Sequence, residues 1–151
     1  MNDVERFLAH AVQLEREAAR RYEELSAAMQ TEGNGELKTF FARMAHYSRL
    51  HLAQASARAG FRDLPPLRPD EFEWPEGTSP EMAAWAGVDA QMDGLAALLL
   101  ALDGERRGHA YYATMAATTT DAELRAIATE FADEESEHVA ELQRLIAACA
   151  A

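Results

Sequence analysis

The sequence predicts an all-α protein folded as an antiparallel four-helix bundle, and three observations predict it. Apolar residues recur every three or four positions along four long segments, which is the spacing of one face of an α-helix. Turns rich in glycine, proline or threonine separate these segments, and none of them alternates as a strand does. With 151 residues, the chain is expected to form one domain over 1–151, long enough to close a core without disulfides.

Turn signals set the expected bounds of the first hairpin. The first helix is expected over about 3–30, ahead of the turn at 33–35, which reads Gly-Asn-Gly. A second helix is expected over about 36–59 and ends at Gly60, a glycine that suits a helix C-terminus. Two helices joined by so short a turn lie side by side and run in opposite directions.

A long crossover follows, expected over 60–79. All five prolines of the chain fall between Pro65 and Pro80, which argues against a regular element there. We expect Trp74 and Trp85 to anchor the end of this crossover against the bundle, with a dimer contact as the alternative.

The second hairpin begins after the prolines. Ser79 as N-cap, with proline in the first turn, predicts a third helix over about 80–117, with a break near Gly87 or Gly94 as an alternative. A run of three threonines and an aspartate predicts the start of a fourth helix over about 121–148.

Two tight hairpins joined by one long crossover are the ferritin-like form of the four-helix bundle. The two halves also correspond in sequence. Glu15 and Tyr22 are seven residues apart, as are Glu105 and Tyr112, and the histidines of the second and fourth helices match as well. This repeat predicts a pseudo-twofold axis on which the polar residues of both halves converge.

Carboxylates and imidazoles interrupt the apolar faces near the middle of the helices. Buried, unpaired carboxylates cost several kcal/mol, so a fold that buries three of them must neutralise them, and a bound metal does so most economically. Glu135 and His138 form Glu-x-x-His, which places both side chains on one helical face. The mixture of ligands suits iron, and zinc or manganese would accept the same ligands. The candidate ligands are Glu15, His51, Glu105, Glu135 and His138.

Charge and composition narrow the function classes. A formal net charge of −12 argues against nucleic acid and anionic membrane partners, which need a cationic surface. The longest apolar run is too short to span a bilayer, and the chain is expected to be soluble and cytoplasmic. Cys149 is the only cysteine, which excludes a disulfide framework, and it is expected to be buried. His10 is expected at the surface or in an interface.

The chain resembles the rubrerythrin family of the ferritin-like superfamily, without a rubredoxin domain. The likeness covers all four helices and rests on Glu15-x-x-Ala18-x-x-x-Tyr22, Glu105-x-x-Gly108-x-x-Tyr111-Tyr112 and Phe131-Ala132-Asp133-Glu134-Glu135-x-x-His138. The resemblance implies a non-haem di-iron centre used in peroxide reduction or ferrous-iron oxidation. It also implies that Glu15 and Glu105 are terminal carboxylates, Glu135 a bridging one, and His51 and His138 the nitrogen ligands.

One position departs from the family pattern. The second helix carries Ser48 where Glu-x-x-His requires glutamate, so one bridging carboxylate is missing. Three carboxylates leave two divalent ions with one uncompensated positive charge, which predicts weaker binding of one ion, an open bridging position or a single-metal site. Tyr22 and Tyr112 are candidates to support the site, with ordinary core packing as the alternative. Tyr47 lies four residues before His51, which would bring it closer to the site, but its match in the repeat is Glu134, which lies off the apolar face.

These observations lead to two functional hypotheses. The first is a di-iron oxidoreductase acting on peroxide, dioxygen or ferrous iron, which needs an external electron donor because the chain has no CxxC pair. The second is a non-catalytic metal-binding or structural bundle with a degenerate site. A homodimer is expected in either case.

Overall fold

A computed structural model describes residues 2–59, 67–74 and 92–150, and within these ranges it contains helices and no strand. Four long helices form a ferritin-like antiparallel bundle, which confirms the predicted fold class. A short 3₁₀ helix, η1, lies in the crossover. The elements are α1 (Asp3–Glu32), α2 (Gly35–Ala59), η1 (Pro69–Glu71), α4 (Gly94–Thr118) and α5 (Ala122–Ala150).

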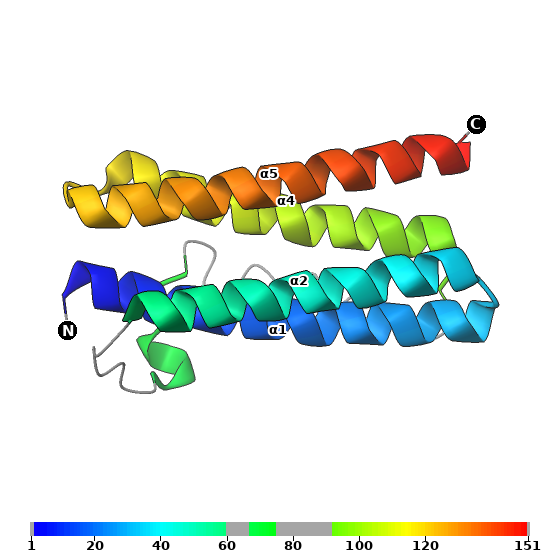
Figure 1. Cartoon of the computed structure of the whole chain (residues 1–151), viewed down its shortest axis with the longest axis horizontal. Helices are drawn as coiled ribbons and strands as arrows, with labels where there is room; N and C mark the ends of the chain where they lie inside the picture. Colours follow the sequence, from blue (N-terminus) through cyan, green and yellow to red (C-terminus); the bar gives the residue numbers. More distant parts are fainter. Residues whose placement is uncertain (1, 60–66, 75–91, 151) are drawn as a thin grey trace.

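The chain forms two hairpins that lie side by side (Figure 1). Helix α1 packs mainly on α2, and α4 packs mainly on α5, while α1 also contacts both helices of the second hairpin. Helix α2 ends near the N-terminus of α1, whereas α4 begins at the opposite end, beside the α1–α2 turn. The connection between the hairpins therefore has to span the length of the bundle, in agreement with the predicted long crossover.

Helix ends follow the capping rules. Asn2 caps α1 in a capping box, and α1 ends at Gly33, whose positive φ of 80° suits a residue without Cβ. The Asp121 carboxylate accepts the Leu124 N–H at 3.1 Å and caps α5, as the sequence predicts.

The predicted third helix begins later than expected. Residues 75–91 lie outside the described residues, so the proposed start at Ser79 is not described. Met92 and Asp93 are not helical, and Asp93 caps α4 by accepting the Ala96 N–H, so one continuous helix over 80–117 is wrong. The helix begins at Gly94, one of the two breaks considered. A Cβ at Gly94 would stand 2.8 Å from Leu37 Cδ1, so glycine allows α4 to start against α2.

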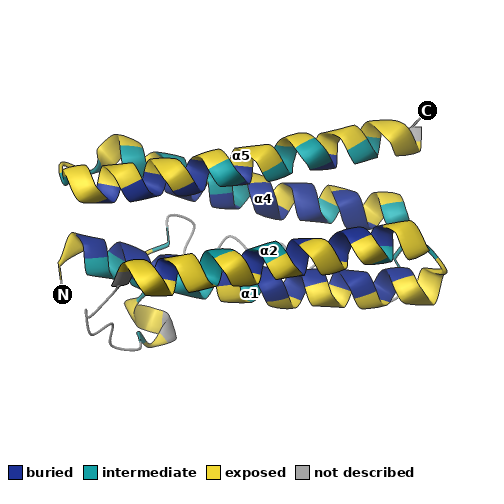
Figure 2. Cartoon of the chain, viewed as in Figure 1, coloured by how far each residue is buried: buried dark blue, intermediate teal, exposed yellow. Residues whose placement is uncertain are grey.

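The buried apolar residues form two clusters, one toward each end of the bundle. Figure 2 shows the buried faces of the helices turned toward the bundle interior. Between the clusters, every helix contributes a polar side chain to the interior, so the core contains a polar layer. One cluster is centred on Phe7, Tyr112 and Phe131, and the other on Tyr22, Phe41 and Leu98.

Part of the crossover is held against α1 by His10, whose expected position at the surface is wrong. His10 is only 2% exposed, and its Nδ1 lies 2.8 Å from the Arg6 carbonyl oxygen. Its Nε2 accepts the Glu73 backbone N–H at 2.8 Å, and burial lowers the pKa of this imidazole. Trp74 packs edge-on against His10 with ring centroids 4.7 Å apart, so it anchors the crossover as predicted, whereas Trp85 lies outside the described residues.

The C-terminal end of α5 extends beyond the core. Cys149 is exposed, which corrects the prediction of a buried thiol; α5 packs on the core as far as Ile146. Within the described ranges, no helix combines the length and apolar character that crossing a bilayer demands.

Candidate metal centre

The polar layer is organised around two buried glutamates, one from each hairpin. Glu15 on α1 is 2% exposed and Glu105 on α4 is 3% exposed. The Tyr112 hydroxyl donates to Glu15 Oε1 at 3.1 Å, and the Tyr22 hydroxyl donates to Glu105 Oε1. Each tyrosine therefore orients the glutamate of the other hairpin, which is the reciprocal pattern that the internal repeat predicts.

The second oxygen of each glutamate faces a histidine of its own hairpin. Glu15 Oε2 lies 3.7 Å from His51 Nδ1, and Glu105 Oε2 lies 3.5 Å from His138 Nδ1. The two imidazoles stack with ring centroids 5.5 Å apart and an interplanar angle of 17°. Each hairpin thus presents one carboxylate oxygen and one Nδ1 to the same part of the interior.

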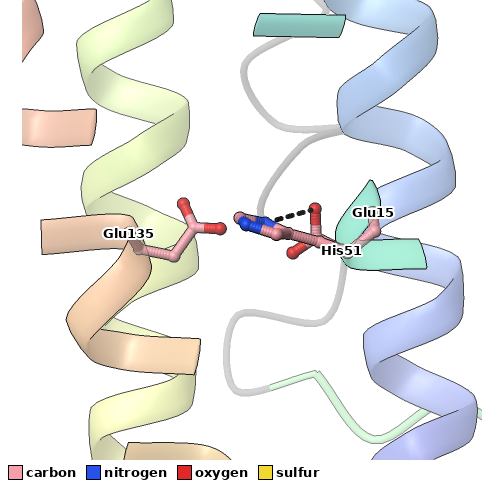
Figure 3. Close-up of side chains that lie close together, drawn as sticks. All are labelled: Glu15, His51 and Glu135. Carbon is pink, nitrogen blue, oxygen red and sulfur yellow. Dashed lines mark ion pairs between the residues drawn. The ribbon is translucent and has the colours of Figure 1, made fainter. Parts of the chain in front are cut away.

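Glu135 on α5 connects the two halves of the site. Its carboxylate belongs to a group with Glu15 and His51 and to a second group with Glu105 and His138; in each, the candidate ligand atoms lie within 4.8 Å of one another. Figure 3 shows Glu135 reaching from the second hairpin toward His51 and Glu15 of the first. Three ligands at such spacing suit one metal ion, and Glu135 is common to both groups.

Electrostatics of the metal-free site favour charged side chains despite their burial. Burial opposes ionisation of Glu105, but the neighbouring Glu135 carboxyl, the His138 imidazole and the Tyr22 hydroxyl outweigh it and lower the pKa of Glu105 to about 2. Burial likewise disfavours protonation of both histidines. Glu15 outweighs burial at His51 and Glu105 outweighs it at His138, so both pKa values are raised. The negative charge of the buried carboxylates thus favours the protonated form of both imidazoles.

Two facing atoms of the metal-free site are buried without a hydrogen-bond partner. Glu105 Oε2 and His138 Nδ1 are both buried and make no hydrogen bond, although they face each other. A buried carboxylate oxygen and imidazole nitrogen left this way carry a desolvation cost that a shared cation would remove. The donor set of carboxylate oxygens and imidazole nitrogens therefore fits a metal ion.

The five candidate ligands and the two tyrosines expected to support them meet in this layer. Ser48 is 5% exposed and occupies the position on α2 where the family pattern requires glutamate. The structure thus brings together the five candidate ligands and both tyrosines, while Ser48 is buried on the same helix as His51.

Sequence reasoning missed three residues at the site. Glu134 was placed off the apolar face and Tyr47 was matched to it, yet Glu134 Oε2 lies 3.1 Å from His51 Nε2 and the Tyr47 ring stacks on His138. Arg21 was not considered. It is fully buried, with its guanidinium carbon 4.5 Å from the centroid of the Tyr22 ring.

A signal for these residues was available in part. Glu134 and Tyr47 occupy equivalent positions, four residues before the two site histidines. For Arg21 the signal is a glycine: a Cβ at Gly104 would stand 2.6 Å from Arg21 Nη1, so the absence of a side chain beside Glu105 makes room for the guanidinium.

Comparison with known proteins places the chain beside one solved structure. No protein-family model matches the sequence, and no curated protein matches it. The crystal structure of an uncharacterized conserved protein from Magnetospirillum magnetotacticum MS-1 matches with a TM-score of 0.78 and 37% sequence identity. The match covers 97% of this chain and 94% of that chain. At this identity over nearly the whole length of both proteins, the chain belongs to the same family as this uncharacterized conserved protein.

Proposed function

We propose that this chain is a rubrerythrin-like protein whose polar layer holds a non-haem di-iron centre, and that it acts as an oxidoreductase on peroxide, dioxygen or ferrous iron. The observation that carries the proposal is the sharing of Glu135 between two Glu–His pairs related by the internal repeat. A single structural ion pair needs neither the shared carboxylate nor the reciprocal tyrosines.

Different residues of the layer would serve as ligands of each ion. Glu15 and His51 would bind one ion and Glu105 and His138 the other, each histidine through Nδ1, while Glu135 would bridge them. Tyr112 and Tyr22 would fix the terminal carboxylates. Burial raises the pKa of the Tyr112 hydroxyl well above its usual value, as does the charge of Glu15, so this hydroxyl stays protonated and keeps donating.

The chemistry would require a reductant from outside. When bound, a pair of ferrous ions supplies the two electrons that reduce hydrogen peroxide to two water molecules, with two protons consumed. The apolar clusters on both sides of the layer limit the access of bulk water. With Cys149 as the only cysteine, the chain cannot carry its own rubredoxin-type relay, so an external electron donor would restore the ferrous state.

The experiment is to load the protein anaerobically with ferrous iron and to measure iron per chain by elemental analysis and Mössbauer spectroscopy. Two irons per chain that couple magnetically once peroxide has oxidised them, and that are lost in Glu135→Ala, are the expected result. One iron or none would refute the di-iron proposal. If zinc or manganese bound in preference to iron under competitive loading, the identity of the metal would change but the assignment of the site would stand.

Ser48 favours a second candidate function, a non-catalytic bundle with a single-metal or degenerate site. Serine is a poor ligand when neutral, so one bridging carboxylate is absent from the expected set. Iron that binds but is not oxidised by peroxide would support this candidate over the oxidoreductase. In both cases we propose a homodimer, which light scattering of the purified protein would test.

A further inference from the structure

Glu134 places a carboxylate against the outer edge of a candidate metal ligand. It lies on α5, next to Glu135 in sequence, and its Oε2 is 3.1 Å from Nε2 of His51 on α2. This oxygen is buried and accepts no hydrogen bond. Glu134 thus belongs to one hairpin, while the histidine that it contacts belongs to the other.

The equivalent position in the other half of the repeat carries no charge. Tyr47 lies four residues before His51, as Glu134 lies four residues before His138. The Tyr47 ring stacks on His138 with centroids 6.0 Å apart and an interplanar angle of 14°. One site histidine is therefore flanked by a carboxylate and the other by a neutral ring, so the two halves of the site are chemically unequal.

The two nitrogens of His51 have distinct surroundings. Nδ1 faces Glu15 Oε2 at 3.7 Å, on the side of the candidate ligands, and Nε2 faces Glu134. A histidine that binds a metal through Nδ1 must carry its proton on Nε2, because a neutral imidazole has one proton. That N–H would then lie beside the Glu134 carboxylate, whose negative charge increases the basicity of the ring as a ligand.

Glu134 also balances the charge that Ser48 leaves uncompensated. Three ligand carboxylates leave two divalent ions with one excess positive charge, and a fourth carboxylate brings the sum to zero. Among the described residues, Glu134 supplies a carboxylate beside the site that belongs to neither group of candidate ligands.

We propose that Glu134 is a positioning residue that supplies the fourth carboxylate charge through His51. As a result, the ion held by Glu15, His51 and Glu135 binds more tightly than the ion held by Glu105, His138 and Glu135. This inference rests on the proposed metal centre and deepens it. It assigns to the chain a replacement, on a different helix, for the carboxylate absent at Ser48.

The test is titration of the full-length, metal-free protein with Co²⁺, followed by calorimetry and by the visible spectrum of the bound ion. Wild type is expected to bind two ions with unequal affinities. Glu134→Gln keeps the size of the side chain and removes its charge, and it is expected to weaken the tighter site by about 10- to 100-fold while leaving the weaker site unchanged. Glu137→Gln, an exposed glutamate on the same helix, is the matched control.

A rescue variant separates charge from packing. In the Glu134→Gln background, Ser48→Glu restores a fourth carboxylate from α2, and the lost affinity is expected to return. A purely structural role for Glu134 would not be rescued by a substitution on another helix. Equal titrations of Glu134→Gln and wild type would overturn the inference and leave the proposed metal centre standing, whereas a wild type that binds no ion would overturn both.

Discussion

Replacement of Glu135 by glutamine tests whether one carboxylate serves two ions. Glu135 belongs to both groups of candidate ligands, whereas Glu15 belongs to one. Glu135→Gln keeps the shape of the side chain but removes its charge, so it is expected to weaken both sites together. Glu15→Gln is expected to weaken only the site that contains His51.

The magnitude follows from ligand linkage. An ion present at 100 times its dissociation constant stabilises the folded state by about 2.7 kcal/mol, so two such ions contribute about 5 kcal/mol. For a chain of this length, each kcal/mol raises Tm by about 2–4 °C, so metal is expected to raise the Tm of wild type by about 10–20 °C. Glu15→Gln should keep about half of this increase, and Glu135→Gln should keep almost none of it.

The assay is thermal unfolding followed by circular dichroism, with chelator and with Co²⁺, for wild type and both variants. Metal-free Glu135→Gln must show wild-type helix content, which separates loss of binding from loss of fold. If Glu135→Gln kept half of the increase in Tm, Glu135 would serve one ion only and the bridging argument would be wrong. Equal losses in the two variants would show that the two ions do not bind independently.

Three further predictions concern stability. Both site histidines have pKa values raised above the unfolded value of 6.5, so their contribution is complete below about pH 6.5 and disappears as the pH rises through the folded pKa values. The Tm of the metal-free protein should therefore fall between about pH 6.5 and 9. Metal affinity should rise over the same range, because imidazoles bind metal in their neutral form. A metal-free Tm that rises with pH would contradict the raised pKa values of the two histidines. Gly104→Ala brings a Cβ to 2.6 Å from Nη1 of the fully buried Arg21, so it should lower the free energy of unfolding, measured with urea, by about 1–3 kcal/mol. Gly35→Ala is the control and should change it little, because a Cβ there meets nothing within 4 Å. Tyr112→Phe removes the hydroxyl that donates to Glu15 at 3.1 Å and should lower the free energy of unfolding by about 1–3 kcal/mol, so an unchanged urea midpoint would count against a supporting role.

Helical periodicity explains how much of the site could be predicted. With 3.6 residues per turn, apolar residues mark the inward face, and any glutamate or histidine on that face must enter the core. This argument finds Glu15, Glu105, Glu135 and both histidines without knowledge of contacts. The correspondence of the two halves then predicts that they converge, and the structure brings their side chains into one layer.

Residues beside the inward face were harder to place. Each helix of a bundle has two neighbours, so its buried surface is wider than one row of side chains. Glu134 lies about 100° around α5 from Glu135, a rotation that turns it away from the central row but toward α2 of the other hairpin. Sequence spacing alone does not say which neighbour a flanking side chain meets.

His10 and Arg21 show the same limit for contacts distant in sequence. Burial of His10 depends on Glu73 and Trp74 of the crossover, more than 60 residues away along the chain. Arginine is seldom fully buried, so exposure is the expectation for Arg21 until the space left by Gly104 is known. Neither pairing leaves a periodic signal in the sequence.

The joining of two similar hairpins in one chain has an evolutionary consequence. A dimer of identical hairpins would repeat every side chain on both sides of its axis, so a serine in place of a bridging glutamate would remove both bridges at once. A single chain can change one copy and keep the other, and here α2 carries Ser48 three residues before its histidine, where α5 carries Glu135. Because the two hairpins are encoded in one chain, each can change independently of the other. A symmetric ancestral site can thereby acquire two ion positions with different properties.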